Sequence, residues 1–167
     1  MAPSDAQPPR SAVDGLIDAW QAAWSGRDAD AFAQLCTPEV HYEDPLTEEP
    51  LEGAEAIAAH AERLWAGFPD VRVETLGPRV IDGAMVVAPA KLVATNRDAF
   101  EGLPATGRFI VVPLVFYCQL QDDRLQRVRA FFDLYDTGVQ LGLLPGRGTL
   151  GGKALLMLRG FGLRGGR

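Results

Sequence analysis

The second half of the chain is a succession of strand-like segments, and this succession constrains the fold more than any other feature of the sequence. The segments are rich in β-branched and aromatic residues, and short polar turns such as Asp82-Gly83 separate them. Because short turns join antiparallel neighbours, we expect a meandering antiparallel sheet. The predicted strands cover residues 71–76, 80–81, 85–95, 109–120 and 125–135.

The first half carries helical patterns instead, in which apolar residues recur at three- and four-residue spacing. Ser11 is the predicted N-cap of the first helix, with Asp14 in the capping-box position. Asp28 is the predicted cap of a shorter second helix that Pro38 stops, and Pro69 stops the third. The three apolar stripes are Val13, Leu16, Ile17, Trp20 and Trp24; then Phe32, Leu35 and Cys36; then Ile57, His60, Ala61, Leu64, Trp65 and Phe68.

Two prolines bear on the shape of the sheet. Pro89 and Pro113 fall inside predicted strands, where a residue without an N–H indicates a bulge or an edge. We therefore expect an α+β fold in which a cone-shaped, curved antiparallel sheet wraps around three N-terminal helices and leaves a cavity. This domain covers residues 11–145, and Asp136 is expected to cap a last short helix that ends at Gly142. Residues 1–10 hold three prolines and are predicted to be disordered.

Composition limits the classes of binding partner and the cellular compartment that we expect for the protein. The hydrophobic share of 47% fits one folded domain, and the net charge of −6 disfavours nucleic acid. Cys36 and Cys118 lie in apolar surroundings without metal-ligand spacing, which indicates small buried thiols rather than a disulfide. No apolar run approaches the roughly 20 residues that span a bilayer, and the N-terminus has no hydrophobic signal region. These features predict a cytoplasmic protein.

The C-terminal segment, residues 146–167, is rich in glycine and carries five basic residues and no acidic one. A short helix here would lie on an anionic membrane or close the mouth of the pocket. Its glycines disfavour a stable isolated helix, so an unstructured tail is the favoured interpretation, and membrane contact is not expected.

Asp44 is the most informative acid in the chain. In the short strand before Pro45, Val40, Tyr42 and Asp44 share one face, and the first two are large and apolar in body. An acid on that face points toward the interior, where loss of water would raise its pKa and make it a better base near neutral pH. The alternative is a turn residue that bonds its own backbone, which is common for Asp before Pro.

Five segments, in order, resemble the nuclear transport factor 2-like superfamily, on its side of ketosteroid isomerases and SnoaL-like polyketide cyclases. They are AWSGRDADAF, YEDPLTEEPLEG, FPD, GLPATG and RAFFD…QLGLLP, and together they cover residues 11–145. The resemblance implies a cone-shaped roll, a homodimer formed through the outer face of the sheet, and a hydrophobic small-molecule substrate. It implies proton transfer with no metal and no organic cofactor.

Carried over residue by residue, the ketosteroid-isomerase pattern places its general base at Asp44; that enzyme is a worked case of an aspartate base with an oxyanion hole. The tyrosine of the hole falls at Trp20, which keeps one N–H donor, and its protonated aspartate falls near Phe116, which offers none. Loss of such a donor costs on the order of 100- to 1000-fold in rate. Steroid isomerisation by the familiar machinery is therefore not expected.

Two further residues resemble catalytic positions of SnoaL-like proteins. His60 would act as acid beside Asp44 or hold its carboxylate, and the alternative is a core histidine with its bonds satisfied. Asp133 resembles an acid/base near the end of the last strand. Because Ala130 and Phe132 share the pocket face, a regular strand would turn Asp133 away, as a surface acid or a helix cap.

Aromatic residues would line the pocket, as cavity wall and core overlap in such a fold. The leading hypothesis is a cofactor-independent isomerase or cyclase acting on a polyketide- or steroid-like carbonyl compound. A non-catalytic binding module is the alternative. An epoxide hydrolase would need a carboxylate–arginine–carboxylate set, yet its acid falls at Ala130 and Arg129 is expected to face outward. The expected lining residues are Trp20, Trp24, Tyr42, Trp65, Phe68, Phe116 and Phe132.

Overall fold

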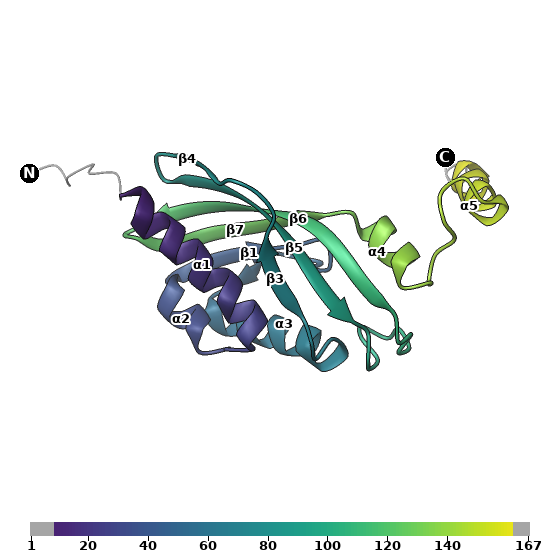
Figure 1. The fold of residues 1–167 in the computed structure, drawn as a ribbon, viewed down its shortest axis with the longest axis horizontal. Coiled ribbons are helices and arrows are strands. Elements are labelled where there is room, and N and C mark those ends of the chain that lie inside the picture. Colours follow the sequence, from purple (N-terminus) through teal and green to yellow (C-terminus); the bar gives the residue numbers. More distant parts are fainter. Residues whose placement is uncertain (1–8, 162–167) are drawn as a thin grey trace, which may run out of the picture.

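The computed structural model describes residues 9–161, and Figure 1 shows three helices on one face of a long, curved sheet. Helix α1 is Arg10–Gly26, α2 is Ala31–Leu35 and α3 is Ala54–Gly67. The strands are β1 Cys36–Glu43, β2 Leu51–Glu52, β3 Arg72–Thr75, β4 Val80–Asp82, β5 Met85–Thr95, β6 Phe109–Gln121 and β7 Arg124–Phe132, and the chain continues into α4 Leu134–Gln140 and α5 Leu150–Phe161.

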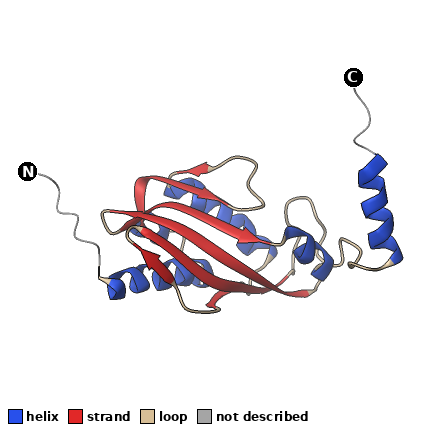
Figure 2. Cartoon of the chain, turned by 90° about the horizontal axis from the view of Figure 1, so that it is seen from above, coloured by secondary structure: helices blue, strands red, loops and turns tan. Residues whose placement is uncertain are grey.

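Within the described residues the strands form one seven-stranded sheet in the order β2-β1-β7-β6-β5-β3, with β4 paired to β5. The predicted α+β fold, with a curved sheet around N-terminal helices, is confirmed, and the sheet is not closed into a barrel (Figures 1 and 2). One pairing departs from the expected antiparallel pattern, because β1 runs parallel to β7. The strand that leads to Asp44 is therefore paired with β7, the last strand in chain order.

The β4–β5 hairpin forms at the predicted Asp82-Gly83 turn, with Asp82 opposite Met85. The two prolines do not produce bulges, since β5 and β6 pair without a register shift along their length. Pro89 lies between the stretches of β5 that pair with β4 and β3, and Pro113 lies just beyond the end of the β6–β7 pairing. Both occupy places where a neighbouring strand is missing, so the predicted edge positions are correct.

Several predicted helix ends differ from the structure. Helix α1 begins at Arg10 after an extended Pro9, without a side-chain cap, so Ser11 is not the N-cap; residues 1–8 of the predicted disordered segment lie outside the described residues. The Asp28 carboxylate accepts from Ala31 N at 3.1 Å at the start of α2, as predicted. Cys36 already belongs to β1, because the chain is extended there.

The C-terminal segment also differs from its prediction. The sequence favoured an unstructured tail, but Leu150–Phe161 form helix α5. This helix stands apart from the sheet in both views (Figures 1 and 2). The exposed fractions of Leu150 and Met157 are 87% and 67%, so these side chains are not part of the core. In the described part of the chain, no helix has the length and apolar character needed to cross a bilayer.

The core lies between the helices and the inner face of the sheet. Trp20, Phe32 and Ile57 are completely buried there, and side chains at alternate positions of β5, β6 and β7 pack against them. Cys36 and Cys118 are buried free thiols, as predicted, and burial raises the pKa of each to about 12. At such a pKa both side chains stay protonated and behave as small apolar groups.

Candidate functional site

A cavity of about 450 Å³ opens between α3, the inner face of the sheet and α4. Its size is within the range of small-molecule sites. Asp44 is its one ionisable carboxyl among the described lining residues, and it stands with Tyr42 and His60 in an otherwise almost wholly apolar wall. The lining residues are Trp24, Tyr42, Asp44, Leu46, His60, Leu64, Phe68, Val73, Leu92, Phe100, Leu103, Ile110, Val112, Leu114, Phe116, Ala130, Phe132, Leu134, Thr137, Gly138, Leu141, Leu143 and Leu144.

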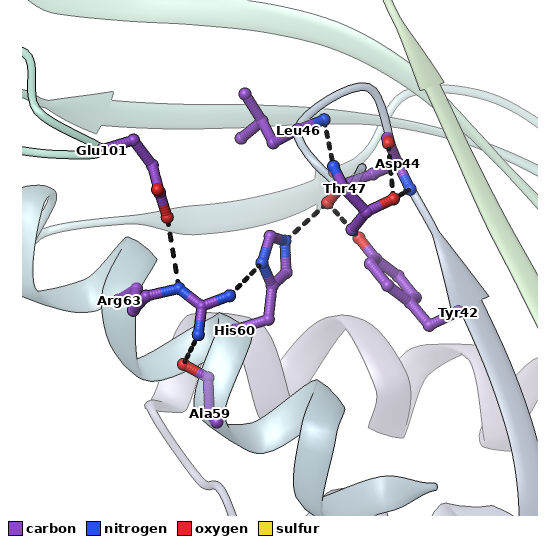
Figure 3. Close-up of polar contacts among 8 residues, drawn as sticks. All are labelled: Tyr42, Asp44, Leu46, Thr47, Ala59, His60, Arg63 and Glu101. Carbon is purple, nitrogen blue, oxygen red and sulfur yellow. Dashed lines mark hydrogen bonds and ion pairs between the residues drawn. The ribbon is translucent and has the colours of Figure 1, made fainter. Parts of the chain in front are cut away.

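Asp44 lies directly after β1, where Pro45 begins a turn. Its Oδ1 accepts the backbone N–H groups of Leu46 at 2.7 Å and Thr47 at 3.2 Å. Because its side chain is only 6% exposed, Asp44 points inward as the strand pattern predicted. The turn interpretation is also correct, since one carboxylate oxygen holds the turn while the other faces the cavity residues (Figure 3).

The second carboxylate oxygen of Asp44 receives two side-chain donors. His60 Nε2 lies 2.8 Å from Oδ2, and the Tyr42 hydroxyl donates to the same atom at 2.9 Å. The side chain of His60 is 5% exposed, so the buried pair exchanges little with water. Helix α3 brings His60 against the end of β1, because Ile57, His60 and Ala61 belong to its buried stripe.

The pKa of Asp44 corrects a prediction. Burial raises it, as expected, but the hydrogen bonds from His60, the Leu46 N–H and the Tyr42 hydroxyl together bring it below the ordinary value. The Asp44 side chain is therefore ionised at neutral pH and well solvated by the protein. Burial and the neighbouring Asp44 charge raise the pKa of Tyr42, which keeps its hydroxyl proton as a donor.

Five of the seven predicted lining residues do line the cavity: Trp24, Tyr42, Phe68, Phe116 and Phe132.

Trp20 and Trp65 are corrections. Trp20 is completely buried and its ring packs 5.3–6.1 Å from those of Trp24, Phe32, Tyr42 and Phe116, so its N–H is not presented to the cavity. The indole nitrogen of Trp65 donates to Trp24 O at 2.9 Å within the core.

Asp133 does not reach the cavity. It follows β7 and caps α4, accepting from Asp136 N at 2.9 Å, and its Oδ2 binds Arg147 at 2.6 Å. Its side chain is 49% exposed. The strand parity that turned Asp133 away is thus correct, while the role implied by the resemblance is not supported. The helix cap is Asp133 and not Asp136, because β7 ends three residues earlier than predicted.

Sequence reasoning missed the other side of His60. Arg63 Nη2 lies 3.3 Å from His60 Nδ1, and Arg63 Nε donates to Glu101 at 3.2 Å. Arginine three residues after a histidine on one helix was a usable signal, since such residues are neighbours on its surface. The place of Leu141 and Leu144 in the cavity wall was also missed, although the apolar run QLGLLP pointed to it.

Two other kinds of site lack support. Across residues 9–161, no group of three or more His, Cys, Asp or Glu side chains is arranged to hold a metal ion. Arg129 faces outward and pairs with Glu43 at 3.5 Å, and no arginine lines the cavity within that range. The carboxylate–arginine–carboxylate set that epoxide opening was expected to need is therefore not assembled around the apolar cavity.

Comparison with known proteins places this geometry in a family. The model of the SnoaL-like polyketide cyclase family matches residues 15–141. TsrD from Streptomyces laurentii has a similar structure, with 26% identity and a TM-score of 0.72 over 81% of this chain and 98% of that one. No match is found among curated proteins.

Two further structures show the same fold. One is a candidate SnoaL-like polyketide cyclase from Jannaschia sp. CCS1, with 24% identity and a TM-score of 0.73 over 86% of this chain and all of that one. The other is AclR from Streptomyces galilaeus, described as a candidate hydroxylase, with 20% identity and a TM-score of 0.70 over 82% of this chain and all of that one. With a family model spanning most of its length and this fold around one buried acid, the chain belongs to the SnoaL-like polyketide cyclase family.

Proposed function

We propose that the protein is a cofactor-independent enzyme that isomerises or cyclises a hydrophobic, polyketide- or steroid-like carbonyl compound by proton transfer. The observation that carries this proposal is the ionised Asp44 at the wall of an apolar cavity, with His60 and Tyr42 donating to one of its oxygens. Charge in a dry, apolar site acts strongly on a bound ligand. A carbonyl compound with an acidic C–H would meet its base there.

The three side chains suggest how charge moves. Asp44 takes a proton from the carbon next to the carbonyl group, which leaves a neutral carboxyl and places negative charge on the carbonyl oxygen. The donors Tyr42 O–H and His60 Nε2–H lose an anionic acceptor at that moment, and the new oxyanion can take their hydrogen bonds. Return of the proton to another carbon gives isomerisation. Attack of the enolate carbon on a second carbonyl carbon closes a ring instead, and the alkoxide formed there takes the proton back from the Asp44 carboxyl.

Hydrogen exchange tests this chemistry without knowledge of the natural substrate. Polycyclic ketones and polyketide-like 1,3-diketones are incubated with the protein in D₂O, and deuterium uptake at carbon is followed by mass spectrometry. We expect uptake that falls by about 100-fold or more in Asp44→Asn while ligand affinity is retained. Equal uptake in the variant and the wild type would contradict the proposal.

A non-catalytic binding module is the second candidate, and one observation favours it. The four hydrogen bonds to Asp44 fill the acceptor positions of a carboxylate before any ligand enters. Under this alternative, Asp44 organises the turn and the cavity and transfers no proton. Ligand binding with no deuterium uptake by the wild type on any bound ketone would support it.

We also propose a homodimer through the outer face of the sheet. Alternate side chains of β6 point away from the cavity, and the outer face exposes Phe109, Val111 and Tyr117 of β6 beside Phe131 of β7. Analytical ultracentrifugation of Tyr117→Glu against the wild type tests this, with a monomer expected for the variant. The two buried free thiols agree with a cytoplasmic location, which remains a proposal.

A further inference from the structure

The two nitrogens of His60 face different partners. Nε2 lies 2.8 Å from the Asp44 carboxylate, and Nδ1 lies 3.3 Å from Arg63 Nη2 (Figure 3). A guanidinium N–H can only donate, so Nδ1 has to supply its lone pair to make this bond. The ring proton then belongs on Nε2, where the carboxylate accepts it. Arg63 and Asp44 together therefore select one tautomer of the imidazole.

Arg63 is held in place by two other contacts. Its Nη1 donates to Ala59 O at 3.4 Å on the preceding turn of α3, and its Nε donates to Glu101 Oε1 at 3.2 Å. The guanidinium group is thus tied to its own helix and to the loop between β5 and β6. These contacts aim Nη2 at the imidazole ring, as Figure 3 shows.

The backbone at Glu101 is unusual. Phe100 and Leu103 exchange both N–H···O=C bonds, and the two residues between them, Glu101 and Gly102, have φ values of 47° and 76°. Such two-residue turns prefer glycine, asparagine or aspartate at both central positions. A glutamate that occupies this disfavoured conformation and binds Arg63 indicates a role beyond forming the turn. Phe100 and Leu103 also line the cavity, so the turn belongs to its wall.

We propose that Arg63, anchored by Glu101, is the positioning residue of the Asp44–His60 pair: it occupies the Nδ1 lone pair and keeps the imidazole as the Nε2–H tautomer. The consequence for turnover rests on the proposed function, because that tautomer holds a donor beside Asp44 for the developing oxyanion. The tautomer of His60 itself is a property of the ligand-free protein and can be measured without a substrate. The titratable or charged groups facing the ring are Asp44, Tyr42 and Arg63.

A simple surface ion pair is the competing explanation, since the side chains of Arg63 and Glu101 are 54% and 48% exposed. Such pairs contribute little on their own. The chain supplies a matched control in Arg72 and Glu74, a pair of similar exposure that faces no imidazole. Arg72→Ala therefore removes an equivalent charge and leaves the surroundings of His60 intact.

The test is ¹⁵N NMR of protein labelled at histidine. The chain has two histidines, so the signals that remain in His41→Gln belong to His60. At neutral pH we expect an unprotonated Nδ1 and a protonated Nε2 in the wild type. Arg63→Ala should move the Nδ1 resonance away from its wild-type position toward that of a free lone pair, because the guanidinium that donates to Nδ1 is gone. Arg63→Lys should restore most of the wild-type position, Glu101→Gln should shift it partly, and Arg72→Ala should leave it unchanged.

An unchanged His60 spectrum in Arg63→Ala, or a wild-type ring protonated at Nδ1, would overturn the proposal. Thermal unfolding of each variant checks that the fold is intact, and Arg63→Lys together with Glu101→Gln decides the matter if the alanine variant does not fold. The readout is independent of catalysis. If His60 is the Nε2–H tautomer but Asp44→Asn keeps its deuterium uptake, only the proposed function is rejected. If the His60 spectrum does not respond to substitution of Arg63, only the present proposal is rejected.

Discussion

Asp44 and Asp133 are both aspartates that follow a strand, both resemble catalytic acids, and both have a lowered pKa, yet the fold uses them differently. For Asp44, burial raises the pKa and the donors of His60, Leu46 and Tyr42 outweigh it. For Asp133, the N–H of Asp136 and the exposed Arg147 are the main causes, with little burial to oppose them. The comparison teaches that a shifted pKa marks a functional site only when the acid also faces a cavity.

The largest expected difference between the two aspartates is in deuterium uptake after each carboxylate is replaced by a neutral amide. In the deuterium-uptake assay, Asp44→Asn is expected to lose about 100-fold or more, whereas Asp133→Asn should retain the wild-type rate within about twofold. The reason is that only Asp44 contacts the cavity. Similar losses in the two variants would show that the comparison is wrong.

Removal of the histidine partner should reveal how much of the Asp44 charge it stabilises. His60→Ala leaves a buried carboxylate with one fewer donor, and the free energy of unfolding should fall by about 2–3 kcal/mol. Urea denaturation measures this change. The Arg147→Ala variant, which removes the partner of Asp133, should change stability much less than His60→Ala does, because that ion pair is exposed.

Acid should act on the two carboxylates in the same direction, with different sensitivity to salt. A folded-state pKa below the unfolded value means that the stabilisation is complete above about pH 4 and is lost as the pH falls through the lowered pKa. Urea midpoints between pH 7 and pH 2 should therefore fall less steeply in Asp44→Asn than in the wild type. Raising the salt to about 1 M should weaken the part that depends on exposed Asp133 more than the part that depends on buried Asp44.

The smallest effect is expected at the cap. Asp133→Ala removes the acceptor of the Asp136 N–H at the start of α4, and the melting temperature should fall by about 2 °C. Asp133→Ser, which can still cap, should recover most of the loss. A fall much larger than this would indicate that α4 stabilises the cavity more than its contacts suggest.

Local patterns predicted most of the fold, because strand alternation and the Asp82-Gly83 turn report burial and hairpins directly. The same alternation correctly turned Asp44 inward and Asp133 outward. Local patterns do not report contacts between residues that are far apart in the sequence. The parallel pairing of β1 with β7 and the burial of Trp20 under other rings depend on residues far apart in the sequence.

The pKa of Asp44 was predicted in the wrong direction for a related reason. Strand parity indicated burial, which raises the pKa, but nothing local showed that His60 from α3 would lie 2.8 Å away. The hydrogen bond from the Leu46 N–H agrees with the turn interpretation of Asp before Pro, whereas the one from the Tyr42 hydroxyl was not predicted, although Tyr42 shares the strand face of Asp44.

The parallel alignment of β1 with β7 has a consequence for biosynthesis. Tyr42 lies opposite Val128 and Glu43 opposite Arg129, so the strand leading to Asp44 gains this neighbour only after more than half of the polypeptide has followed it from the ribosome. In the nascent chain this strand can pack only against β2 and the preceding helices, so the Asp44 carboxylate reaches its final surroundings late. A chain truncated before β7 should therefore be degraded rather than accumulate as a folded fragment.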